Sequence, residues 1–136
     1  MLRSAIILAG VFGFGMTAAE IKFIANPSVK VAELTTEELK RVFLIKTNSL
    51  RDGSHVEPVI GQGSPAYEIF LKQYLGKNDS ALTTYYLSLV FTGKALMPKL
   101  LASDAEVIAY VTKTKGTVGY VIASANTPGL RSMAIK

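Results

Sequence analysis

Residues 117–123, with the sequence TVGYVIA, constrain the fold of this chain more than any other segment. Nearly every side chain in the segment is apolar, so both faces of the corresponding strand are apolar. A strand at a solvated surface alternates apolar and polar residues, whereas a strand that is apolar on both faces is covered on both. The segment therefore predicts the central strand of a sheet.

Three further segments are predicted to be strands. Residues 22–25 (KFIA) form a short strand that the pair Asn26-Pro27 closes, because a residue before proline avoids the helical conformation. Residues 56–60 form a second strand, in which Pro58 indicates an edge or an irregular position because proline lacks a ladder N–H. Residues 130–136 follow a Pro-Gly turn and are expected to be a last edge strand.

Two helix starts carry a capping box, in which a Ser or Thr and a Glu three residues later bond to each other's free backbone N–H groups. The first box pairs Thr35 with Glu38, and the second pairs Ser103 with Glu106. The apolar residues that follow the first box on one helix face are Leu39, Val42 and Phe43. The second helix carries Val107, Ile108, Val111, Lys113 and Lys115, and its stop is Gly116.

Apolar residues at the spacing i, i+3, i+4, i+7 and i+8 predict two more amphipathic helices. One follows Ser64-Pro65 and ends at Gly76, and its stripe is Tyr67, Phe70, Leu71, Tyr74 and Leu75. The other is capped by Asp79 or Ser80 and ends at Gly93, and its stripe is Leu82, Tyr85, Tyr86, Leu89 and Val90. Strands therefore alternate with helices, which is typical of the α/β class.

The N-terminus has the layout of a secretory signal peptide. Met1-Leu2-Arg3 gives a positive start, residues 5–16 are an uncharged apolar run, and Thr17-Ala18-Ala19 supplies small residues for cleavage after Ala19. An uncleaved N-terminal anchor is the alternative, although the run is short for a bilayer span. We expect residues 1–19 to be removed on export to the periplasm. Residues 20–136 are then one domain without stable membrane insertion.

The composition excludes several classes of function. The chain has 15 Lys and Arg against 10 Asp and Glu, but the bases are scattered and no basic run with interleaved aromatics indicates a nucleic-acid partner. The absence of cysteine excludes disulfides and thiolate chemistry. His55 is the only histidine and lies in a polar loop, so neither a zinc site nor a catalytic set is indicated. The sequence predicts a protein that is not an enzyme and needs no cofactor or metal.

The turn Gly61-Gln62-Gly63-Ser64-Pro65 is the strongest candidate for binding. A glycine-containing turn that enters a helix offers free backbone N–H groups, a hydroxyl and the positive end of the helix dipole to an anion. A structural reading competes with this one, because Ser at the N-cap and Pro at the first helical position are favoured at any helix start. The turn is neither a nucleophile elbow nor a P-loop.

The order of motifs resembles that of phosphate-type substrate-binding proteins of ABC transporters. Asn26-Pro27-Ser28 followed by residues 34–44 (LTTEELKRVFL) is similar to an N-P segment and the helix after it in that family. Residues 46–59 (KTNSLRDGSHVEPV) resemble the family's loop and strand. Residues 89–121 resemble the F-T-G-K, S-D-x-E-V and G-Y-V pattern of a short subgroup. The match covers nearly all of residues 20–136.

This resemblance implies an α/β fold that corresponds to a single lobe of a type II periplasmic-binding-protein-like fold, with a small mixed sheet flanked by helices. Full-length members have two such lobes that close on the ligand. The family usually has Ser-Gly-Thr, often followed by Arg, where this sequence has Gly63-Ser64-Pro65-Ala66-Tyr67, so Ser64 is retained. The family's usual Trp is replaced by Leu50. The implied ligand-binding residues are Asn26, Ser28, Gln62, Gly63 and Ser64.

Two functions follow as hypotheses. The first is a periplasmic module that binds phosphate or another small oxyanion, with a homodimer as one way to complete a cleft, since pockets favour interfaces between domains. The second is a ligand-free accessory protein that uses the lobe to contact an envelope protein partner, because a fold does not fix a function.

Overall fold

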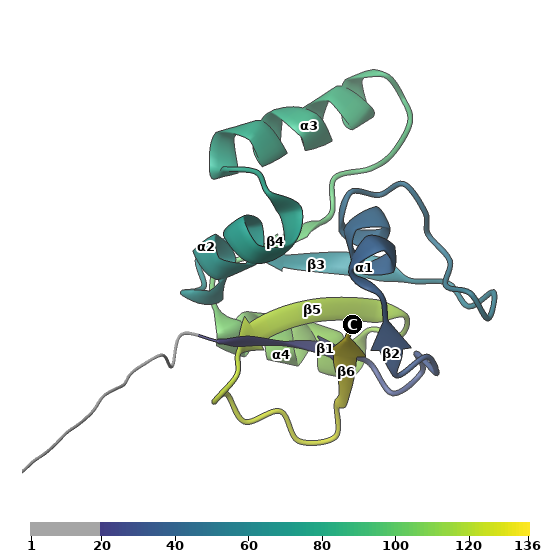
Figure 1. Cartoon of the computed structure of the whole chain (residues 1–136), viewed down its shortest axis with the longest axis vertical. Coiled ribbons are helices and arrows are strands. Elements are labelled where there is room, and N and C mark those ends of the chain that lie inside the picture. Colours follow the sequence, from purple (N-terminus) through teal and green to yellow (C-terminus); the bar gives the residue numbers. More distant parts are fainter. Residues whose placement is uncertain (1–19) are drawn as a thin grey trace, which may run out of the picture.

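The computed structural model describes residues 20–136, and the predicted signal peptide lies outside the described residues. These residues form one six-stranded mixed sheet with the strand order β2-β6-β1-β5-β3-β4 (Figure 1). The strands are β1 (Ile21–Ala25), β2 (Glu33–Leu34), β3 (Glu57–Gly61), β4 (Lys99–Leu101), β5 (Thr117–Ile122) and β6 (Arg131–Ile135). The helices are α1 (Thr36–Phe43), α2 (Ala66–Phe70), the π-helical segment η1 (Leu71–Leu75), α3 (Asp79–Phe91) and α4 (Asp104–Lys113).

The direction of the strands decides which loops meet. β3 pairs in parallel with β4 and β5, whereas β1 is antiparallel to β5 and β6, and β2 is parallel to β6. The carboxyl ends of β3, β4 and β5 therefore lie side by side at one end of the strands. We call this end of the sheet the carboxyl edge, which is different from the edge strands. The carboxyl end of β1 lies at the opposite edge.

Helices cover both faces of β5, which confirms that residues 117–123 predict a central strand (Figure 1). α4 packs on one face, in a cluster made of Ile24, Val59, Val107, Val111 and Val121. Its approach is close, because a Cβ at Gly119 would lie 2.9 Å from Val107 Cγ1. α1, α2 and η1 pack on the other face, and α3 lies further out on that side (Figure 1).

Four aromatic rings pack against one another at the centre of the larger core. Phe70 of α2 stacks on Tyr120 of β5 with ring centroids 4.2 Å apart, and Phe43 of α1 meets Phe70 edge-on at 4.8 Å. Phe23 of β1 lies edge-on to Phe43 and Phe70 at 6.0 Å. The stripes predicted for α1 and for the helix after Ser64 thus face the core, as their spacing requires.

β3 is not an edge strand, because it lies inside the sheet between β5 and β4, but Pro58 does occupy an irregular position that is unpaired on its β4 side. The N–H of Glu57 donates to the carbonyl of Gly116 on the β5 side, at 2.8 Å. Successive residues of a strand direct their N–H groups to opposite sides, so the nitrogen of Pro58 faces β4. Pairing with β4 begins only at Val59, and the missing N–H therefore has no ladder partner to lose.

The edge strands also differ from the prediction. β6 is not an edge strand, because it pairs with β1 on one side and with β2 on the other. The true edges, β2 and β4, have two and three residues, which is too short for a period-two pattern to reveal them.

Helix ends follow the predictions with local differences. The Thr35–Glu38 capping box is present. Ser103 caps α4, but the Glu106 carboxylate accepts from the N–H of Ala102 at 3.1 Å and not from that of Ser103. Asn78 caps α3, in place of the predicted Asp79 or Ser80. None of the helices within residues 20–136 has both the length and the apolar character needed to cross a membrane.

Candidate functional site

The carboxyl edge gathers the turns that follow three parallel strands. Residues 62–65 connect β3 to α2, residues 102 and 103 connect β4 to α4, and β5 ends beside them at Ile122. Two helix N-termini, those of α2 and α4, therefore meet at this edge. In open α/β sheets, ligands bind outside the carboxyl ends of the strands.

Ser64 links these elements. Its Oγ accepts a hydrogen bond from the N–H of Ala66 at 3.0 Å, which caps α2 as the sequence predicts, and it donates to Asp104 Oδ1 at the start of α4. Asp104 Oδ2 in turn accepts from the N–H of Ile122 at 3.1 Å. Ser64 is buried, so its hydroxyl serves this network and is shielded from solvent.

Gly63 is required by a close approach of two backbones. A Cβ at this position would lie 2.1 Å from the carbonyl oxygen of Ala102, far inside van der Waals contact. The N–H of Gly63 points to the carbonyl of Leu101 at a long 3.4 Å. Beside Gly63 and Leu101 lies a shallow hollow of about 380 Å³. It is lined by Gln62, Gly63, Leu100, Leu101 and Ala102.

Gln62 is the exposed polar side chain of the turn. Its Nε2 lies 3.4 Å from Asp79 Oδ1, which also accepts a 2.6 Å hydrogen bond from the Tyr67 hydroxyl. Burial and the hydrogen bond to Asp79 raise the pKa of Tyr67, so its hydroxyl keeps its proton at neutral pH. The amide of Gln62 makes only this long contact and is free to reorient toward a ligand.

Tyr120 adds a buried hydroxyl behind the turn. Burial, followed by the neighbouring Tyr67, raises the pKa of Tyr120, while the backbone of Gly61 lowers it in part. The hydroxyl is enclosed and donates to no acceptor within residues 20–136. It is thus a protonated donor beside the end of β3.

Charge at the carboxyl edge is mixed. The positive ends of two helix dipoles favour an anion. However, the carboxylates of Asp79 and Asp104 oppose one, and the backbone N–H groups of Ser64, Ala66 and Tyr67 already have acceptors within the protein. Side chains of Gln62 and Tyr120 are the donors that remain. Within the described residues no three His, Asp or Glu side chains lie close enough together to hold a metal ion.

The structure does not bring the five predicted site residues together. Asn26 and Ser28 follow β1 and lie at the opposite edge, where the N–H of Asn26 donates to the carbonyl of Thr117 at the start of β5. β3 separates them from Gln62 by four residue steps, or about 13 Å. The prediction of one shared site is therefore wrong, because β1 runs antiparallel to β3.

Asn26 and Ser28 have internal partners. The Asn26 amide donates to the carbonyls of Val111 and Thr112 at 2.8 and 3.2 Å and accepts from the N–H of Ser28 at 2.9 Å. Ser28 Oγ accepts from the N–H of Gly116 at 2.9 Å. Both side chains tie β1 to the end of α4.

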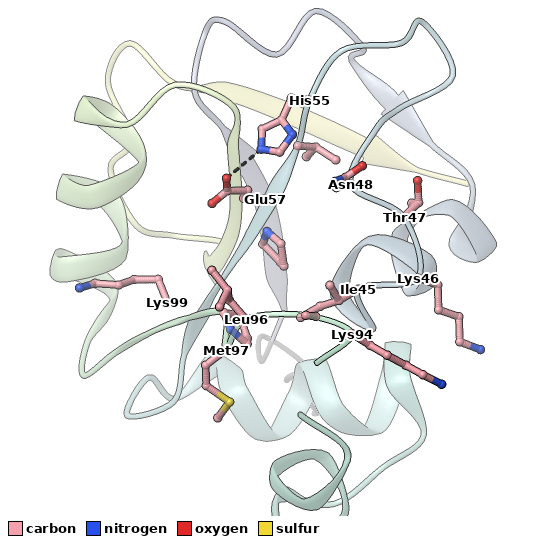
Figure 2. A pocket seen from close by; sticks show the side chains of 14 residues that line it. Ile45, Lys46, Thr47, Asn48, His55, Glu57, Lys94, Leu96, Met97 and Lys99 are labelled. Atoms are coloured by element: carbon pink, nitrogen blue, oxygen red, sulfur yellow. Dashed lines mark hydrogen bonds and ion pairs between the residues drawn. The ribbon is translucent and has the colours of Figure 1, made fainter. Parts of the chain in front are cut away.

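A second pocket, which the sequence did not predict, lies at the opposite edge near the start of β3. It has a volume of about 480 Å³, and its walls include Lys46, Lys94 and Leu96 (Figure 2). His55 Nε2 lies 2.8 Å from Glu57 Oε2 at its rim. The only signal in the sequence was the apolar stretch Ala95-Leu96-Met97 between Lys94 and Pro98, which belongs to no predicted helix or strand.

No family model matches the sequence, and no curated protein is significantly similar to it. Three solved structures match this chain with TM-scores of 0.65, 0.63 and 0.65 and identities of 15%, 16% and 10%. They are a Clostridium perfringens protein assigned as a phosphate ABC transporter substrate-binding protein and holding phosphate, PstS from Borrelia burgdorferi, and an ABC-type phosphate transport receptor from Vibrio cholerae.

Each match covers 85% of this chain, and the chain spans 44% to 47% of the length of those structures. Identities this low show the fold alone. The fold of residues 20–136 is accordingly that of a single lobe of a type II periplasmic-binding-protein-like structure, as the sequence motifs predict.

Proposed function

We propose that residues 20–136, which have the fold of one lobe of a phosphate-type substrate-binding protein, form a periplasmic module that binds a small oxyanion without catalysis. One observation carries the proposal: the Gln62–Ser64 turn leaves the carboxyl end of β3 and enters α2 beside the N-terminus of α4. This edge is where open α/β sheets bind ligands.

The donors at the edge support an oxyanion. The amide of Gln62 is exposed, and the Tyr120 hydroxyl is a protonated donor without an acceptor among the described residues. An anion in the hollow beside Gln62 and Gly63 also gains from the α2 and α4 dipoles. Asn26 and Ser28 lie outside this proposed site, in which Gln62 and Gly63 face the ligand while Ser64 holds the turn through Asp104.

Asp104 sets the expected selectivity. An ionised carboxylate is an acceptor only, so it repels a fully deprotonated anion but accepts a hydrogen bond from one that carries a proton. Phosphate retains a proton at neutral pH, whereas sulfate does not. The site is therefore expected to prefer phosphate to sulfate.

Thermal unfolding of the protein expressed from the full sequence tests the proposal with phosphate, sulfate and chloride at equal ionic strength. A ligand present at about 100 times its dissociation constant stabilises the folded state by about 2.7 kcal/mol. We expect phosphate to raise the midpoint and sulfate to raise it less. Gln62→Ala should reduce the phosphate effect without lowering the midpoint of the free protein.

Asp104→Asn provides the sharper comparison, because it removes a negative charge and retains polar atoms near Ser64. Two unit charges about 4 Å apart in water interact by about 1 kcal/mol, so sulfate should bind about fivefold more tightly to this variant. Asp52→Asn, in an exposed loop, is the matched control and should change nothing. Equal midpoints in all three salts would reject the oxyanion site and leave the accessory-protein hypothesis.

A further inference from the structure

The exposed large apolar side chains come from one stretch of the chain, formed by α3 and the loop and strand that follow it. All the large apolar residues that are exposed within residues 20–136 lie between positions 87 and 100. Phe91 at the end of α3 is 82% exposed and Leu96 in the following loop is 87% exposed. Contiguous exposure of this kind indicates an interaction site, whereas single exposed apolar residues are ordinary.

The helix that presents this surface has an uncharged outer face. Leu82 and Tyr86 face the core from one side of α3, while Leu87 and Phe91, one turn apart, are exposed. Residues 80–103 contain no Asp or Glu. Apart from Asp79, its first residue, α3 therefore has no carboxylate that would repel an anionic partner.

Two lysines flank the apolar residues. Lys94 directly precedes the 95–97 segment, and the carbonyl of Leu89 accepts its N–H at 2.8 Å, which holds the loop against the last turn of α3. Lys46 lines the same 480 Å³ pocket as Lys94 and Leu96, and Figure 2 shows both lysines on one side of it. Glu57 is the one carboxylate among the residues that line the pocket, and His55 pairs with it.

We propose that Leu87, Phe91 and Leu96, together with Lys46 and Lys94, form a lipid-docking surface for an anionic phospholipid bilayer. The charge of the lysines complements lipid phosphates, and long lysine side chains keep their ammonium groups at the headgroup level while their stems contact apolar surface. Phe91 and Leu96 are almost fully exposed. Exposed apolar side chains flanked by lysines are suited to insertion at the headgroup boundary of an anionic bilayer.

The lipid-docking surface leaves the proposed oxyanion site open. The first residue of α3, Asp79, contacts Gln62 and Tyr67 at the carboxyl edge, whereas the last, Phe91, lies near Lys94 at the other end of the helix. Thirteen residues of α-helix span about 20 Å. Lipid docking is thus independent of oxyanion binding, and either can fail alone.

Co-sedimentation with vesicles tests the proposal. We expect the protein to sediment with vesicles of phosphatidylglycerol and phosphatidylcholine, not with phosphatidylcholine alone, and to be released by added salt. The double variant Phe91→Ser, Leu96→Ser should reduce binding by about tenfold or more, because it removes two large apolar side chains. Lys46→Glu and Lys94→Glu should each reduce it by about fivefold or more.

Lys30→Glu is the matched control, since Lys30 is an exposed lysine in the segment leading to β2, across the sheet from β4. It should bind vesicles as the unsubstituted protein does. Equal binding to neutral vesicles, no binding to anionic ones, or an equal loss in Lys30→Glu would each overturn the proposal. So would a change from dimer to monomer in the double variant on analytical ultracentrifugation, because the surface would then be an interface between copies of the chain.

Discussion

Ser64 and Asp104, 40 residues apart in the chain, are joined by a hydrogen bond from Oγ to Oδ1. The second oxygen of Asp104 accepts the N–H of Ile122. One carboxylate therefore fastens the turn after β3 and the end of β5 to the start of α4. The candidate site owes its shape to this contact.

Ser64→Ala should lower the free energy of unfolding by about 2 kcal/mol, because it removes the α2 cap and leaves Asp104 without one donor. Ser103→Ala removes only the α4 cap and should cost about 1 kcal/mol. Urea unfolding of both variants measures the difference, which reports the Ser64–Asp104 bond. Equal losses would show that this bond contributes nothing.

Gly63→Ala should destabilise the fold by about 3 kcal/mol, because the new Cβ meets the backbone carbonyl of Ala102. This carbonyl cannot move without shifting the connection from β4 to α4. Gly61→Ala is the control. Its Cβ would lie 3.0 Å from the side-chain atom Val107 Cγ2, which can adjust, so a smaller loss is expected. Calorimetry ranks the two, and the reverse order would contradict the packing.

Ile45→Gly should stabilise the protein, although it deletes a partly buried side chain. Ile45 follows α1 with φ 56°, a left-handed conformation that costs a β-branched residue about 1–2 kcal/mol. The loss of packing and the flexibility of glycine offset part of this, and a net gain of up to about 1 kcal/mol is expected. Chemical denaturation checks the sign. Leu44→Gly, at a buried neighbouring position without this strain, should be destabilising.

Acid should weaken the start of α1. The backbone N–H of Thr35, and to a lesser degree Arg51, hold the pKa of Glu38 below its ordinary value of 4.5. A carboxyl whose pKa is lower in the folded state stabilises that state fully above 4.5, and the contribution is lost as the pH falls through the folded pKa.

The Glu38→Gln variant should therefore show less change in unfolding free energy between neutral pH and the acid range than the unsubstituted protein. Denaturation at a series of pH values measures this slope. Arg51→Ala should retain most of the slope, because the backbone of Thr35 is the largest cause of the lowered pKa. An unchanged slope in Glu38→Gln would contradict this assignment.

The local features that were predicted correctly each depend on a few neighbouring residues. The Thr35–Glu38 box, the Ser64 cap and the Gly76 stop satisfy backbone groups within one turn, so their residue types are sufficient to identify them. Asn78 was missed as the cap of α3, because Asp79 and Ser80 are equally good capping residues in sequence.

Only one part of the candidate site was predicted from the sequence. The turn with Gln62, Gly63 and Ser64 is contiguous and could be recognised from its residues. The error over Asn26 and Ser28 concerned strand direction, which a single sequence does not reveal. The partners of the turn, Asp104 and Tyr120, come from distant segments and carry no sequence signal for this contact.

The sequence alone determined the α/β class, the central place of β5 and the starts of α1, α2 and α4, because apolar period and capping depend on adjacent residues. Only the tertiary structure decided that β1 runs against β3, that Pro58 is tolerated inside the sheet, and that Asp104 meets Ser64. Strand order and direction arise from packing between segments far apart in the chain. That packing brings the parts of a site together or keeps them apart.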